Sequence, residues 1–160
     1  MAIRVGDRLP QVETLTQLVD GRKAPISIDE VFKGKRVVLL AVPGAFTPTC
    51  SAKHLPGFVR LADQIRAKGV DEIVCTAVND AYVLEAWKKE QGADAIRMLA
   101  DGNGDFAAAL GLDKDGRAGG MGVRSQRYAM VVDDGVVKVL NVEESGEFAA
   151  SRAETILELL

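Results

Sequence analysis

The chain contains little cysteine, histidine or aromatic side chain. Its 160 residues include two cysteines, one histidine and 5% aromatic residues. Two cysteines are too few for the disulfide framework of a small secreted protein, so we expect a reducing compartment, the cytoplasm. The sequence has no Cys, His and carboxylate cluster with metal-ligand spacing. Its glycine-rich runs lack the strand-to-helix spacing that holds a nucleotide, so we expect no metal and no other cofactor.

An excess of one charge and long hydrophobic runs are also missing. The formal net charge is −3, from 20 Lys and Arg against 23 Asp and Glu. This balance gives no reason to expect a nucleic acid or an acidic membrane surface as a partner. The longest apolar stretch, residues 37–42, is far shorter than the roughly 20 residues that span a bilayer. The length and the 48% hydrophobic content fit one globular domain, residues 1–160.

The pattern of apolar residues predicts an α/β fold. Buried strands are expected at 37–42, 72–78 and 96–100, and amphipathic helices between them imply parallel pairing. Two later strands, 128–132 and 136–142, flank Asp133-Asp134-Gly135, which is a hairpin signal. Ser151-Arg152-Ala153-Glu154 resembles a capping box that opens a last helix. A βαβ half followed by a ββα half is the order of a thioredoxin-like fold, with a central mixed sheet flanked by helices.

The most informative segment begins where the stretch 37–42 ends. It reads Pro43-Gly44-Ala45-Phe46-Thr47-Pro48-Thr49-Cys50. Thr47 suits a helix N-cap and Pro48 the first helical position, so Cys50 is expected in the first turn. Free N–H groups and the helix dipole stabilise a thiolate there, and the thiolate is the nucleophilic form. Because the surrounding residues are typical of an exposed turn, we interpret Cys50 as reactive. The alternative is an inert buried cysteine.

This segment resembles the peroxiredoxins, thiol peroxidases that reduce hydroperoxides. Pro43, Thr47 and Cys50 match the family's Pro-x-x-x-Thr-x-x-Cys motif. The following run Lys53-His54-Leu55-Pro56-Gly57-Phe58 is similar to the type II, or peroxiredoxin-five, subfamily. The similarity continues through residues 78–80, 100–106 and 124–128 and covers nearly the whole chain. It implies the same thioredoxin-like fold, with N-terminal additions, and peroxide reduction by Cys50.

The resemblance also implies roles for residues around the cysteine. Thr47 would offer its hydroxyl to the peroxide, and Pro43 would shield the sulfur from water. Arg127 would pair with the thiolate and steer the peroxide oxygens, a task that suits the fork of donors on a guanidinium. Arg124 is a second candidate for the positive charge. Without the resemblance, an isolated arginine here would be interpreted as a surface residue at a strand edge.

His54 lies four residues after Cys50, which is one helical turn along. One interpretation makes it a base for Cys50, as in a Cys–His acyl transferase or hydrolase. We favour a solvent-facing or locally supporting histidine, because the sequence shows no separate residue placed to orient the ring. A thioredoxin-fold binding module without activity is a further alternative, which the combination of Pro43, Thr47, Cys50 and Arg127 disfavours.

Cys75 lies inside the predicted strand 72–78, where a small core side chain is the favoured interpretation. Some type II peroxiredoxins have a cysteine at the matching position, so Cys75 is a possible resolving residue. A disulfide with Cys50 would need local unwinding of the helix start. We therefore expect one-cysteine chemistry, with glutathione and glutaredoxin ahead of thioredoxin as reductant. The resemblance also suggests a homodimer.

Overall fold

The computed structural model describes residues 2–144 and 146–160, so Met1 and Ser145 of the predicted domain lie outside it. The helical segments are α1 (Ile28–Phe32), η1 (Cys50–His54), α2 (Leu55–Ala67), α3 (Ala81–Gln91), α4 (Asp105–Leu110), η2 (Arg117–Gly119) and α5 (Ala153–Glu158). The strands are β1 (Thr16–Val19), β2 (Arg22–Pro25), β3 (Arg36–Ala41), β4 (Glu72–Ala77), β5 (Arg97–Ala100), β6 (Asp113–Asp115), β7 (Val123–Ser125), β8 (Tyr128–Asp133) and β9 (Val136–Val142).

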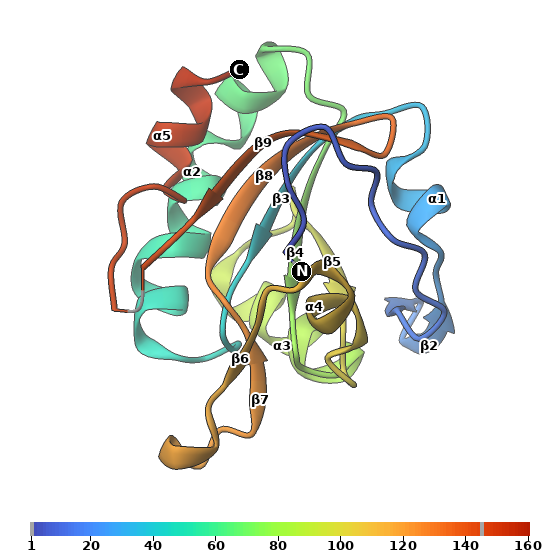
Figure 1. Ribbon diagram of the computed structural model, residues 1–160, viewed down its shortest axis with the longest axis vertical. Coiled ribbons are helices and arrows are strands. Elements are labelled where there is room, and N and C mark those ends of the chain that lie inside the picture. The colour runs from blue at the N-terminus through green and yellow to red at the C-terminus, as the bar shows by residue number, and fades with distance from the viewer. Residues whose placement is uncertain (1, 145) are drawn as a thin grey trace.

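Seven strands form one mixed sheet in the order β2-β1-β5-β4-β3-β8-β9 (Figure 1). The central strands β3, β4 and β5 are parallel, as the predicted helical crossovers require. β1 and β8 join them antiparallel, and β9 pairs antiparallel with β8. The early elements β1, β2 and α1 are the N-terminal additions. The predicted α/β fold with a mixed sheet flanked by helices is confirmed.

Both faces of the sheet are covered by helices (Figure 1). α2, α3 and α5 pack on one face, through a core that contains Phe58, Trp87 and Ile156. α1 and α4 pack on the other face, around Phe32 and Phe106. A strand buried on both faces reads as a continuous apolar run, which is why residues 37–42 were recognisable as the central strand.

The β8–β9 connection confirms the predicted hairpin. Asp134 and Gly135 have φ values of 48° and 79°, and positive φ at both central residues is typical of the two-residue turns that match strand twist. The register that begins at the turn shifts by one residue between Val131 and Val132, and the ladder ends at the pair Tyr128↔Val142. The residues just beyond that end, Arg127 and Glu143, are therefore neighbours across the hairpin.

The predicted capping box of the last helix is wrong. α5 begins at Ala153 with Arg152 at its N-cap, and Arg152 makes no side-chain capping bond. The Ser151 hydroxyl instead donates to the Glu143 carboxylate at 2.7 Å. A hydrogen bond to a charged carboxylate is stronger than one between neutral groups. The contact with Glu143 therefore replaces the local capping bond that the sequence suggested.

A second, short hairpin of β6 and β7 projects from the body of the molecule (Figure 1). The glycine-rich run 116–122 forms its tip, where Gly116 N–H donates to the Gly122 carbonyl at 2.7 Å. Within residues 2–144 and 146–160, no helix is both long and apolar enough to cross a membrane.

Candidate active site

The site lies after the carboxyl end of β3, where the chain turns into a helix. Phe46 adopts a positive φ of 64° in this turn, and the Ala45 N–H donates to the Asn79 side chain at 2.9 Å. A Cβ at Gly44 would lie 3.1 Å from an Arg124 nitrogen, so this close approach favours glycine. The Ser51 N–H donates to the Thr47 carbonyl at 2.9 Å, which places Thr47 at the helix N-terminus as predicted.

Cys50 begins a π-helical turn, η1, that leads directly into α2. The Leu55 N–H bonds to the Cys50 carbonyl, five residues back, instead of to Ser51. Pro56 follows directly and has no N–H to donate. A regular α-helix would therefore also lack one backbone hydrogen bond at this point. The irregularity next to Pro56 takes the form of a π-turn, a feature that often marks functional sites.

The Cys50 sulfur is completely buried, which corrects the expectation of an exposed turn. Residues 46–49, directly before it, are exposed or half-buried, but the helix directs the thiol inward to the core. Arg127 from the start of β8 donates its Nη2–H to Cys50 Sγ at 3.0 Å. A buried sulfur that receives a hydrogen bond from a charged donor differs from an inert core cysteine.

His54 is also completely buried, so the solvent-facing interpretation is wrong and the supporting one is correct. Its Nε2 lies 3.0 Å from the Ser151 carbonyl, which can only accept, so Nε2 carries the proton. Its Nδ1 is then a free acceptor and lies 2.9 Å from Arg127 Nη1. Burial, together with the Arg127 charge, lowers the pKa of His54 to about 3, so the ring is neutral.

The His54 ring is fixed by residues that sequence reasoning missed. Phe58 and Phe148 pack against it with ring centroids 5.6 and 5.2 Å away. Phe148 also lies under the Arg127 guanidinium, at 5.9 Å from ring centroid to Cζ. The spacing of His54 and Phe58, four residues apart on one helix, could have suggested the first contact. Nothing local in the sequence points to Phe148.

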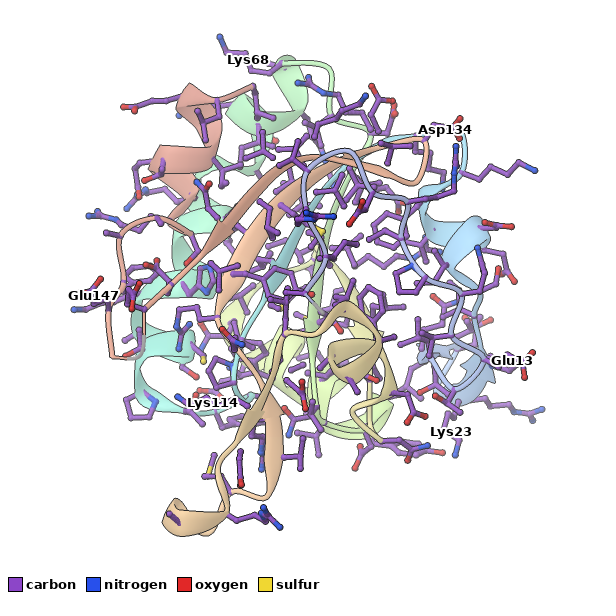
Figure 2. All side chains as sticks on the ribbon, in the orientation of Figure 1. Glu13, Lys23, Lys68, Lys114, Asp134 and Glu147 are labelled. Carbon is purple, nitrogen blue, oxygen red and sulfur yellow. The ribbon has the colours of Figure 1, made fainter. Side chains whose placement is uncertain are left out.

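A pocket of about 560 Å³ opens beside this cluster. Its lining includes Pro43, Thr49, Arg127 and Phe148, with Lys53 at its rim. Two more lining residues, Lys114 on β6 and Glu147 after β9, can be located in Figure 2. Cys50 and Thr47 are not among the lining residues, so a molecule in the pocket meets Pro43, Thr49 and Arg127 first.

Thr47 is half-buried and presents a hydroxyl with a defined orientation. Its Oγ1–H donates to the Gly44 carbonyl at 2.6 Å. With the proton engaged, the lone pairs of the oxygen are free to accept a hydrogen bond. The geometry therefore leaves the Thr47 oxygen able to accept a hydrogen bond.

The comparisons with known proteins agree with this site. The family model described as Redoxin matches residues 4–157. This chain belongs to the Redoxin family. Among its relatives, Peroxiredoxin-2E, chloroplastic, of Arabidopsis thaliana is 51% identical, with 99% of this chain and 70% of that protein covered. Peroxiredoxin-2B of the same plant is 44% identical, with 99% and 98% covered.

Solved structures give the same result. Reduced Prx3 of Vibrio vulnificus in complex with hydrogen peroxide is 54% identical, with a TM-score of 0.94 and 98% of each chain covered. The chain is thus a peroxiredoxin with the thioredoxin-like fold, and the names of its plant relatives fit the type II subfamily. It is a thiol-dependent peroxidase, and the alternatives of a Cys–His acyl transferase and of an inactive binding module are not favoured.

Arg124 and Cys75, the two other residues that the sequence suggested for this peroxiredoxin's site, make no hydrogen bond with the Cys50 sulfur in the described structure. Arg124 donates to the Met121 and Val78 carbonyls, at 2.8 and 3.3 Å, and so supports the loops around the site. Cys75 is a completely buried free thiol in β4, opposite Leu40 of β3. Burial raises the pKa of the Cys75 thiol, and the nearby Cys50 adds to that effect, so Cys75 stays protonated.

In the described part of the chain, no group of three or more His, Cys, Asp or Glu side chains is arranged to hold a metal ion.

Proposed function

We propose that this peroxiredoxin reduces hydrogen peroxide and small alkyl hydroperoxides through Cys50. The Cys50 thiolate attacks the terminal peroxide oxygen, an S–O bond forms and the O–O bond breaks. The electron pair of the O–O bond leaves on the other oxygen as hydroxide or alkoxide, which takes up a proton. Cys50 becomes a sulfenic acid, the first step of cysteine oxidation.

The hydrogen bond from Arg127 to Cys50 Sγ, 3.0 Å long, is the observation that carries this proposal. A donor that already points at the sulfur is also placed to stabilise charge on the peroxide oxygens in the transition state. Thr47, whose proton is held by Gly44, would accept the hydrogen of the peroxide O–H. Pro43 lies at the pocket wall and would limit the access of water. The hydrogen peroxide bound in the Vibrio vulnificus relative supports the small substrate.

The position of His54 argues against Cys–His acyl chemistry. A base for Cys50 would need a ring nitrogen facing the sulfur. Here both nitrogens are engaged elsewhere, one with Ser151 and one with Arg127. We therefore expect hydrolysis of an activated ester to be negligible beside peroxide reduction.

We also propose that an external thiol recycles the sulfenic acid without help from Cys75. Cys75 is protonated, buried and within a strand, so a disulfide would require both segments to open. The pocket, about 560 Å³ in volume, is large enough for a peptide thiol to approach the site. We favour glutathione with glutaredoxin ahead of thioredoxin as the reductant.

A homodimer built near the site and a cytoplasmic location complete the proposal. Phe46, Met121 and Val123 are exposed apolar side chains close to the active-site turn, and apolar surface of this kind is suited to a subunit contact. Sedimentation velocity tests the dimer. The reducing cytoplasm is the proposed location because Cys50 must return to a thiol in every cycle.

The deciding experiment is peroxide consumption coupled to NADPH oxidation. It is run in parallel with glutathione, glutaredoxin and glutathione reductase, and with thioredoxin and its reductase. We expect rapid turnover that is faster in the first system. No turnover in either system, or hydrolysis of p-nitrophenyl acetate at a comparable rate, would contradict the proposed function.

A further inference from the structure

We infer that Glu143 is a remote positioning residue, which sets the orientation of Arg127 toward Cys50 by way of Ser151 and His54. This inference rests on the roles proposed above for Cys50 and Arg127. Glu143 lines the pocket beside the site, but all of its side-chain hydrogen bonds go to residues 149–151 and none goes to Cys50 or Arg127. Its side chain instead holds the segment that fixes His54.

The Glu143 carboxylate accepts four hydrogen bonds from three consecutive residues. The N–H groups of Ala149, Ala150 and Ser151 donate to it at 2.7, 3.1 and 2.8 Å, and the Ser151 hydroxyl donates at 2.7 Å. Burial acts to raise the pKa of Glu143, but these hydrogen bonds outweigh it and the pKa lies below its usual value. The anion is therefore the form that holds the segment at neutral pH.

Ser151 passes this constraint to His54. Because Glu143 fixes both the N–H and the hydroxyl of Ser151, the Ser151 carbonyl has a defined position 3.0 Å from His54 Nε2. That carbonyl can only accept a hydrogen bond, so it selects the tautomer with the proton on Nε2. The lone pair of Nδ1 is thereby left for Arg127.

Arg127 is the last member of the chain of contacts. Its Nη1 donates to His54 Nδ1 at 2.9 Å and its Nη2 donates to Cys50 Sγ at 3.0 Å. Because the guanidinium is planar and rigid, the hydrogen bond that holds Nη1 also fixes the direction in which Nη2 donates. The backbone closes the arrangement, since the Glu143 N–H donates to the Arg127 carbonyl at 2.9 Å. Small displacements of a group that contacts the reacting atoms reduce the reaction rate by large factors.

Two single variants and their combination test the route. Glu143→Ala removes the acceptor for Ser151, and His54→Phe keeps the ring between Phe58 and Phe148 but removes both nitrogens. Oxidation by hydrogen peroxide is followed by stopped-flow fluorescence of Trp87, whose indole N–H donates to Ser51 beside Cys50. We expect each variant to lower the second-order rate constant about tenfold. The double variant should be no slower than His54→Phe alone, because both changes interrupt the same route.

A second measurement separates positioning from general loosening of the fold. The rate of Cys50 alkylation by iodoacetamide at pH 7 reports the nucleophilicity of the sulfur. It should fall in both variants if Arg127 no longer donates to Sγ, whereas a general loosening that exposes the buried sulfur should raise it. Thr155→Ala is the matched control, since the Thr155 hydroxyl also anchors this segment, through the Ala149 carbonyl at 2.9 Å, but not at Ser151. We expect that variant to keep the wild-type rates of oxidation and of alkylation.

The outcomes are distinguishable from failure of the proposed function. If Glu143→Ala keeps the wild-type rate, or if the double variant shows the product of the two single effects, the inference is wrong. Should Glu143→Ala not fold, Glu143→Gln keeps one acceptor oxygen, and a rate loss of about threefold, absent in the His54→Phe background, supports the route. A wild-type rate in Glu143→Gln then overturns it. If Arg127→Ala also oxidises at the wild-type rate, the proposed function itself fails.

Discussion

Cys50 and Cys75 are both completely buried and belong to the same layer of the core, yet they occupy different chemical environments. Cys50 begins a helix, receives a hydrogen bond from a guanidinium and lies behind the wall of a pocket. Cys75 lies in β4, between its two parallel neighbours in the centre of the mixed sheet, where burial raises the pKa of its thiol. Burial alone therefore does not make two cysteines alike. What distinguishes Cys50 is the charged donor on its sulfur.

The largest expected effect is the loss of Cys50 itself. Cys50→Ser should lower peroxide turnover by roughly a thousandfold or more, because a hydroxyl at this position is neither ionised nor an effective nucleophile. Its far-UV circular dichroism spectrum and melting temperature should stay close to wild type. Residual turnover above one-tenth of the wild-type rate would mean that Cys75 can react, and the contrast between the two cysteines would break down.

Removal of the donor that distinguishes Cys50 is the next test. Arg127→Ala should slow the oxidation step by about a hundredfold, since a preorganised donor is lost from both the thiolate and the developing oxyanion. Stopped-flow kinetics measures the rate. Arg124→Ala is the control, because Arg124 supports loops and does not contact the sulfur. Equal losses in the two variants would show that general positive charge matters rather than the contact with Cys50.

The Cys50 side of the core also contains a buried titratable ring, and this makes stability depend on pH. The pKa of His54 is lowered to about 3, mainly by burial and also by Arg127, against 6.5 in the unfolded chain. The unfolded state therefore binds more protons between these values, and stability falls as the pH drops below 6.5.

We expect His54 to reduce the free energy of unfolding by about 2 kcal/mol between pH 7 and pH 5. Urea unfolding at both values measures this loss. Glu143, whose pKa is lowered, contributes in the same direction at more acid pH. His54→Asn has no titrating ring, so it should show a smaller loss over this interval. An equal loss in the variant would contradict the low pKa.

The smallest effect on activity is expected at Cys75. Cys75→Ser should leave turnover supported by glutathione and glutaredoxin nearly intact. It should also lower the free energy of unfolding by about 1–3 kcal/mol, because a hydroxyl is buried in an apolar layer. The coupled assay and urea unfolding measure the two quantities. A collapse of turnover at unchanged stability would indicate that Cys75 resolves the sulfenic acid.

Much of the fold could be predicted from local patterns. The continuous apolar run of β3, the alternation of strands and helices, and the Asp134-Gly135 turn depend on neighbouring residues and on the periodicity of secondary structure. The predicted N-cap at Thr47 was equally local. The predicted capping box at Ser151 failed because Glu143, eight residues away, provides a stronger partner for its hydroxyl.

The segment from Pro43 to Cys50 was sufficient to single out Cys50 as the candidate nucleophile, because a strand followed by a turn and a helix start is encoded by consecutive residues. Which arginine contacts the sulfur, whether His54 faces solvent, and what holds its ring were decided only when β8, β9 and the segment before α5 came together. Arg127 is 77 positions from Cys50 and Ser151 is 97 positions from His54. Contacts at such separations depend on sheet register and chain reversal, which no short pattern contains.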